Sequence, residues 1–143
     1  MKQKITHLPL KVYIIGNIFK GDKVLLRKKF PGSKPYIETW YSFGVEFIPD
    51  QDPYETFLKY IKNDINIDIK LRKKLPWSNE IKIDHDDIKK SFIYLQATFD
   101  YVNGEPFLPI NHESIKFVNF SELSELDIVP PSKVIFKDLG LIK

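Results

Sequence analysis

The first part of the chain alternates between apolar stretches and short polar breaks. Residues 11–19 (KVYIIGNIF) are β-branched and aromatic with almost no polar interruption, which is typical of a well-buried strand. Residues 20–22 predict a tight turn, and residues 23–29 (KVLLRKK) predict a second strand that completes a hairpin. The prolines and glycine of residues 30–35 indicate a loop, and residues 36–45 predict a third extended segment.

A helix is predicted from Pro53 to Ile65. Proline suits the first helical turn, where its missing N–H costs nothing, and Asp52 stands where a capping side chain is expected. Asn66 is a suitable stop. The apolar residues recur at helical spacing and form one stripe that secures the helix in the scaffold: Tyr54, Phe57, Leu58, Ile61 and Ile65.

The second half of the chain predicts further strands and a closing helix. Residues 67–75 alternate apolar and polar side chains, as a half-buried strand does, and residues 91–101 are the longest strand candidate. The shorter features are a turn at 76–79, a strand at 80–84, charged and proline-rich loops at 85–90 and 106–113, a strand at 115–120, a capped helical turn at 121–126 and a helix at 132–139. This order predicts an α+β arrangement.

Composition narrows the class of protein. We expect a single domain over residues 1–143, because this length allows a sizeable core. The fractions of 43% hydrophobic and 29% charged residues indicate a soluble globular protein, and a net charge of +3 is too small to imply a nucleic-acid partner. The chain has no cysteine and no apolar run of signal-peptide or membrane-span length, so we expect a reducing, cytoplasmic location.

Residues 43–67 (FGVEFIPDQDPYETFLKYIKNDINI) carry the strongest functional signal. They combine a strand end with a glycine, a loop with acids and a proline, and a short helix. This layout resembles the Nudix box of the Nudix (MutT-like) pyrophosphohydrolases, whose pattern runs GG-x-x-E-x-G-E and then R-E-x-x-E-E-x-G. Together with its flanking strands, the resemblance extends from about Lys11 to Leu139.

An ungapped match shows that the box is degenerate. Gly44 falls on the first glycine, and Lys59 falls on the arginine. The three helix glutamates correspond to Tyr60, Asn63 and Asp64. The resemblance implies a Nudix-like α/β/α sandwich with a mixed β-sheet, and a hydrolase that acts on a nucleoside diphosphate linked to another group.

The substitutions change the metal chemistry that the resemblance implies. Tyr60, Asn63 and Asp64 are spaced i, i+3 and i+4 and therefore share one helix face. In active family members three carboxylates on this face hold a divalent metal against the diphosphate, and Mg²⁺ prefers hard oxygen ligands. Only Asp64 is a carboxylate here, so we expect a reduced Mg²⁺ site, to which Glu46 adds a second carboxylate if the loop is aligned with a short deletion.

The first hypothesis is a hydrolase of nucleotide sugars or nucleoside triphosphates. The ligand pattern is similar to that of the GDP-mannose mannosyl hydrolase branch, which lacks some helix glutamates, keeps the last one, and uses a histidine from a late loop as its base. Asp64 falls on the retained acid, and Lys59 keeps a cation at the arginine position. His112, just before a late strand, would be the general base.

Two further hypotheses remain open. The chain could bind a nucleotide or nucleotide sugar without hydrolysing it, with Arg27, Lys28 or Lys29 at the phosphates and with Tyr60 beside the ligand. The aromatic side chains available for stacking on a base are Trp40, Tyr41 and Trp77. Alternatively, the domain makes protein contacts and takes no small ligand, and a homodimer is left open.

A run of acids around His85 offers a separate candidate. Asp84, Asp86 and Asp87 flank this histidine and could form a weak metal cluster, although consecutive loop acids are commonly solvated.

Overall fold

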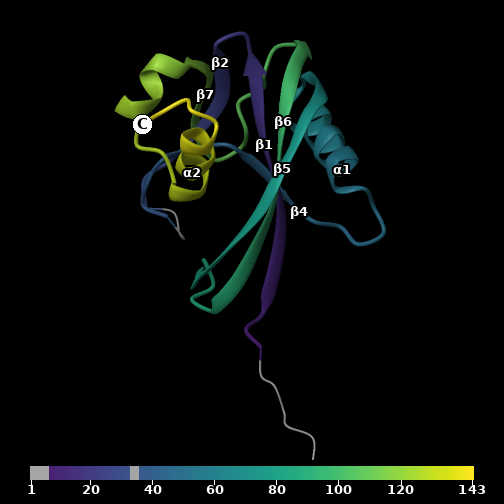
Figure 1. Cartoon of the computed structure of the whole chain (residues 1–143), viewed down its shortest axis with the longest axis vertical. Coiled ribbons are helices and arrows are strands. Elements are labelled where there is room, and N and C mark those ends of the chain that lie inside the picture. Colours follow the sequence, from purple (N-terminus) through teal and green to yellow (C-terminus); the bar gives the residue numbers. More distant parts are fainter. Residues whose placement is uncertain (1–6, 33–35) are drawn as a thin grey trace, which may run out of the picture.

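The structure, a computed structural model, describes residues 7–32 and 36–143 (Figure 1). In chain order the elements are β1 (Leu10–Lys20), β2 (Lys23–Lys29), β3 (Trp40–Tyr41), β4 (Phe43–Glu46), α1 (Pro53–Tyr60), the π-helix η1 (Ile61–Ile65), β5 (Asp68–Ile83), β6 (Lys89–Asn103), β7 (His112–Asn119), the 3₁₀ helix η2 (Phe120–Glu125) and α2 (Pro130–Asp138). None of the helices in the described ranges has the length and apolar character needed to cross a membrane.

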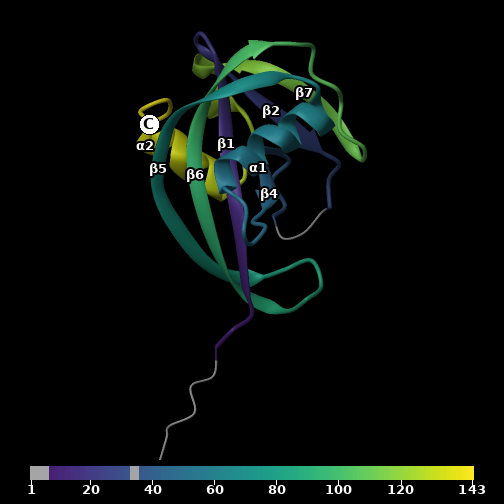
Figure 2. The ribbon, with the colours of Figure 1, turned by 90° about the vertical axis from the view of Figure 1, so that its right-hand side faces the viewer.

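A mixed sheet forms the middle layer. The described strands are ordered β3-β2-β1-β6-β5, with β4 also paired to β1 and β7 to β2. Strands β1 and β6 run parallel, whereas β1 and β2 are antiparallel. Helices α1 and α2 lie on opposite faces of the sheet, as the two perpendicular views show (Figures 1 and 2). The predicted α/β/α sandwich with a mixed sheet is therefore confirmed.

The first hairpin is confirmed at the residues that predicted it. Phe19 is opposite Val24 and Lys20 is opposite Lys23, so residues 21 and 22 make the turn. Gly21 has a φ of 61°, a backbone conformation that glycine adopts without steric cost. Beyond the turn β1 pairs with β4 and β6, and β2 pairs with β3 and β7.

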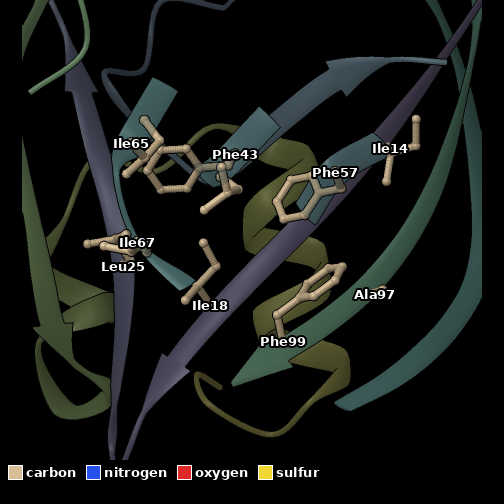
Figure 3. Packing of buried hydrophobic residues seen from close by; sticks show 10 residues of the cluster. Ile14, Ile18, Leu25, Phe43, Phe57, Ile65, Ile67, Ala97 and Phe99 are labelled. Carbon is tan, nitrogen blue, oxygen red and sulfur yellow. The ribbon is translucent and has the colours of Figure 1, made fainter. Parts of the chain in front are cut away.

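Helix α1 is fixed to the sheet by its apolar stripe. Phe57, Ile61 and Ile65 are fully buried, and the ring of Phe57 stacks on that of Phe99 with 4.7 Å between centroids. Figure 3 shows side chains from β1, β4, α1 and β6 meeting in this core. Gly16 allows the close approach, because a Cβ at this position would lie 2.3 Å from the Phe57 ring.

A second core lies under the C-terminal part of the chain. Its buried members are Phe19, Val24, Leu26, Trp40, Val118, Leu123, Ile128 and Phe136. Helix α2 contributes Phe136 to this core. Trp40, the first residue of β3, forms an isolated parallel β-bridge with Ile128, which is another member of the core. The two cores therefore lie beneath the two helices on opposite faces of one sheet.

The helix predicted from Pro53 to Ile65 begins and ends at these residues, but its last part is a π-helix, which is wider than an α-helix. The Asp52 carboxylate accepts hydrogen bonds from the N–H groups of Tyr54 (2.9 Å) and Glu55 (3.0 Å). After Tyr60 the chain continues as the π-helix η1, and Asn66 ends it with a φ of 68°. Such π-helical turns are frequent at functional sites.

The predicted turn at residues 76–79 is wrong, because β5 runs through it. The register with β6 shifts between Leu75 and Ser78, so the irregularity is a bulge. Pro76 is tolerated because β5 is at the end of the sheet order, where a strand needs its N–H groups on only one side.

Other element boundaries also differ from those expected from the sequence. Residues 36–39 are not part of a strand, and the expected third segment is divided into β3 and β4. Strand β6 is longer than predicted and begins at Lys89. His112 opens β7 and does not belong to the preceding loop.

Candidate functional site

Two cavities meet at the side chain of Arg27. The first, termed the aromatic cavity, has a volume of about 400 Å³ and lies on the α2 side of the site. Its described lining includes five aromatic side chains, Tyr13, Tyr36, Tyr41, Phe92 and Tyr94, and three cations, Arg27, Lys29 and Lys82. The second, termed the helix cavity, has a volume of about 730 Å³ and is lined by Arg27, Tyr60, Asp64, Ile65, Phe107, Leu108, Pro109 and Ile110.

Arg27 is held between aromatic rings and, among the residues that the structure describes, has no acidic partner. Its guanidinium carbon lies 4.2 Å from the ring centre of Tyr41 and 4.9 Å from that of Phe43. Its Nη1 donates a hydrogen bond to the Tyr60 hydroxyl at 3.2 Å. Within the described residues its Nε is buried without a hydrogen-bond partner, and no carboxylate lies within ion-pair distance.

His112 lies in the aromatic cavity with both ring nitrogens engaged. Its Nδ1 is 2.9 Å from the Ile110 carbonyl oxygen, which can only accept, so Nδ1 carries the proton. The Nε2 lone pair therefore accepts the hydroxyl of Tyr41, whose ring stacks on the imidazole at 5.7 Å. Burial, together with the nearby Arg27 charge, lowers the pKa of His112 against the opposing effect of the Ile110 carbonyl. The imidazole is thus neutral near pH 7, but its accepting nitrogen points at Tyr41.

A polar network contributes Tyr36, Lys82 and Tyr94 to the lining of the aromatic cavity. The Lys82 ammonium contacts Glu80 at 2.6 Å and the Tyr94 hydroxyl at 2.8 Å, and it also bonds the hydroxyl of Tyr36. The same ammonium lies 3.8 Å from the ring centre of Tyr36 and 4.5 Å from that of Phe92. Burial lowers the pKa of Lys82, and burial with the Glu80 hydrogen bond raises the pKa of Tyr36 and of Tyr94.

Sequence reasoning missed this network because its members come from three separate segments. A signal was nevertheless present: Glu80 and Lys82 are two residues apart, as are Phe92 and Tyr94, so each pair shares one face of its strand. The antiparallel register, which places Glu80 opposite Phe92, brings the two pairs together.

The residues predicted to hold Mg²⁺ do not form a site for it. Asp64 is exposed and lines the helix cavity, whereas Glu46 is exposed at the end of β4 and lines neither cavity. On the helix face Asn63 is neutral, and the Tyr60 hydroxyl already accepts a hydrogen bond from a cation. In the described ranges no three metal-binding side chains converge. A single carboxylate beside an unpaired guanidinium does not fit Mg²⁺, which is usually held by carboxylates together with phosphates.

Of the other residues predicted to act on or bind the substrate, Lys29 lines a cavity, whereas Lys59 and Trp40 do not. Lys29 lines the aromatic cavity, where its ammonium donates to the Tyr36 carbonyl at 2.6 Å, and burial lowers its pKa. Lys59 is exposed on α1 and lines neither cavity. Trp40 is only 8% exposed in the second core, so its predicted role in stacking on a substrate does not agree with its position.

Two further candidates, Lys28 and Asp84, are engaged in ion pairs with neighbouring side chains. Lys28 pairs with Glu113 at 3.5 Å and lies over the Trp40 ring. Asp84 is buried, and although burial opposes its ionisation, hydrogen bonds from Lys90, the His85 N–H and Lys11 hold its pKa well below the usual range. Asp84 and Asp86 are therefore both paired with Lys90, and within the part of the chain that the structure describes the weak metal cluster is not formed.

Comparison with known proteins identifies the fold. No protein-family model and no curated protein matches the sequence. A MutT protein from Methanosarcina mazei is similar in structure, with a TM-score of 0.71, 16% identity and coverage of 92% of this chain and 93% of its own. A Nudix hydrolase from Nitrosomonas europaea has a TM-score of 0.71 at 11% identity and covers 92% and 88%. A MutT protein from Bacillus halodurans has a TM-score of 0.67 at 19% identity and covers 89% and 80%. The chain therefore has the fold of the Nudix hydrolases.

Proposed function

We propose that this chain is a Nudix-fold protein that binds a nucleoside diphosphate linked to a further group, such as a nucleotide sugar or a nucleoside triphosphate. The observation that carries the proposal is the aromatic cavity, in which rings and cations are combined and which meets the helix cavity at Arg27. The base would occupy the aromatic cavity, and the phosphates would extend past Arg27.

The chemistry of the aromatic cavity suits the two halves of such a ligand. Aromatic side chains stack on nucleobases, with a contribution of about 1–3 kcal/mol per base. Lys29 and Arg27 supply positive charge for phosphate oxygens, and charge-assisted hydrogen bonds are the stronger class. A volume of about 400 Å³ lies within the ordinary range of small-molecule sites.

A second candidate is hydrolysis of the same ligands, as in the Nudix hydrolases that share the fold. Asp64 favours it, because this carboxylate shares the helix cavity with Arg27 and Tyr60. We rank hydrolysis second because the helix face offers one carboxylate and because the accepting nitrogen of His112 is engaged by Tyr41. The Asp64→Asn variant separates the candidates: it abolishes turnover if the chain is a hydrolase and leaves binding in place.

Thermal denaturation with a panel of nucleoside triphosphates and nucleotide sugars tests the binding proposal. A ligand present at a hundred times its Kd and bound only by the folded state stabilises that state by about 2.7 kcal/mol. Tyr13→Ala, which removes a ring from the aromatic cavity, should abolish the upward shift in Tm. Tyr54→Ala is the matched control, since Tyr54 is also half-buried but lies on α1 outside both cavities.

The same panel defines the result that contradicts the proposal. If no nucleotide raises the Tm of the wild-type chain, the nucleotide-binding function fails and the protein-contact hypothesis takes its place. A shift that survives Tyr13→Ala unchanged would move the ligand out of the aromatic cavity.

A further inference from the structure

We propose that the Arg27 guanidinium binds the phosphates of the ligand directly and that binding requires no divalent metal ion. This inference rests on the proposed function and specifies how the same site recognises the diphosphate. The fold is that of hydrolases for which we expected Mg²⁺, yet the residues present in the described ranges do not fit this ion.

The position of Arg27 places its charge where the diphosphate would lie. It stands in β2 between β3 and β7, opposite Tyr41 on one side and Ile115 on the other. It is the one cation in the described ranges that lines both cavities. A ligand whose base fills the aromatic cavity must therefore pass the guanidinium when its phosphates extend toward α1.

The charge of Arg27 is not neutralised within the described part of the protein. Its Nη1 donates to the Tyr60 hydroxyl, and its Nε is buried with no acceptor among the described residues. The chain's other arginine differs: Arg72 binds Asp100, with its Nε 2.7 Å from the carboxylate. A partly buried cation without an anion is costly, and a phosphate would satisfy it with two parallel hydrogen bonds.

Tyr60 stands where the Nudix pattern has a glutamate, and this difference leaves the positive charge of Arg27 without a carboxylate partner at this position. The position faces Arg27 closely enough for the hydroxyl to accept from Nη1 at 3.2 Å. A glutamate at this position, as the Nudix pattern has, would form an ion pair with Arg27 and compete with a phosphate. Tyrosine leaves the guanidinium positive and removes a metal-binding carboxylate, so both changes favour direct recognition of an anion.

Isothermal titration with adenosine diphosphate, and with pyrophosphate as a probe without a base, tests this mechanism. Wild-type protein should bind adenosine diphosphate equally well in EDTA and in Mg²⁺. Arg27→Gln should weaken binding of both probes by about ten- to a hundredfold, as expected for loss of hydrogen bonds to a charged group. Arg72→Gln, the matched control, removes the same charge from an arginine outside both cavities and should leave the Kd unchanged.

Two further variants keep the test decisive if Arg27→Gln fails to fold. Arg27→Lys keeps the charge without the planar fork and should bind more weakly than wild type. Tyr60→Glu should weaken binding in EDTA by supplying Arg27 with a carboxylate. The fold of each variant is checked by its thermal transition before titration.

The outcomes separate this inference from the proposed function. Binding of adenosine diphosphate only with Mg²⁺, or equal binding by wild type, Arg27→Gln and Tyr60→Glu, overturns the inference and leaves the nucleotide-binding function intact. Absence of binding with and without Mg²⁺, both for adenosine diphosphate and for every nucleotide of the thermal-denaturation panel, overturns both. Binding in EDTA that is lost with Arg27→Gln supports both.

Discussion

Replacing Phe57 with alanine should destabilise the protein more than other changes on α1. This side chain is fully buried, stacks on Phe99 at 4.7 Å and meets the edge of Tyr60 at 6.1 Å. Its ring also fills the space above Gly16, where even a methyl group would collide with it. The surrounding strands are hydrogen-bonded to one another and cannot collapse fully into the space that alanine would leave.

The expected loss follows from comparable core substitutions. Removing a buried phenylalanine side chain costs about 3–5 kcal/mol, including the term for the residual cavity. An unfolding entropy of about 2.1 cal/mol/K per residue gives about 0.3 kcal/mol/K for a chain of 143 residues. The two figures predict a Tm lower by about 10–17 °C.

Urea denaturation and differential scanning calorimetry measure both quantities. Lys59→Ala is the control on the same helix, because Lys59 is exposed and its replacement should change stability by no more than about 0.5 kcal/mol. If Phe57→Ala costs no more than the control, α1 is not packed on the sheet as described. The positions of Tyr60 and Arg27, on which the proposed site depends, would then also be wrong.

Three other predictions concern the helix cap, a histidine and a buried carboxylate. Asp52→Ala should cost about 1 kcal/mol in urea denaturation, because two N–H groups lose their acceptor; no loss would show that the cap is not formed. The lowered pKa of His112 means that the unfolded chain binds more protons just below the ordinary value of 6.5, so stability should fall as the pH drops through this value. His112→Gln should flatten this dependence, and an unchanged profile would contradict the burial of the imidazole. Asp84→Asn should lower the Tm more than Asp86→Asn, because Asp84 is buried between Lys90 and Lys11 whereas Asp86 is more exposed; equal effects in calorimetry would refute this order.

The sequence predicted those parts of the fold that depend on local chemistry. The β-branched and aromatic run of β1, the turn at Gly21 and the helix that begins after Asp52 are all present. Each is determined by side chains within a few residues of one another. The predicted turn at residues 76–79 failed because the proline that suggested it lies in a bulge at the sheet edge, and only the strand order shows that β5 is that edge.

The site was less predictable because it depends on register. Sequence alone presented Arg27 as one of three consecutive basic residues at a strand end. Its special position arises because neighbouring strand residues point to opposite faces, so that Lys28 meets Glu113 while Arg27 meets Tyr60. Likewise, Trp40 could be identified as an aromatic residue near the motif, but its burial follows from its contact with Ile128 far along the chain.

The measurement that tests the central claim most directly is a crystal structure of the protein grown with adenosine diphosphate in the presence of a chelator. We expect the adenine in the aromatic cavity and phosphate oxygens at about 2.7–2.9 Å from the Arg27 guanidinium nitrogens, the usual length of a charge-assisted hydrogen bond. A nucleotide whose phosphates lie away from Arg27, or a nucleotide that enters the crystal only when Mg²⁺ is supplied, would contradict the proposed mechanism.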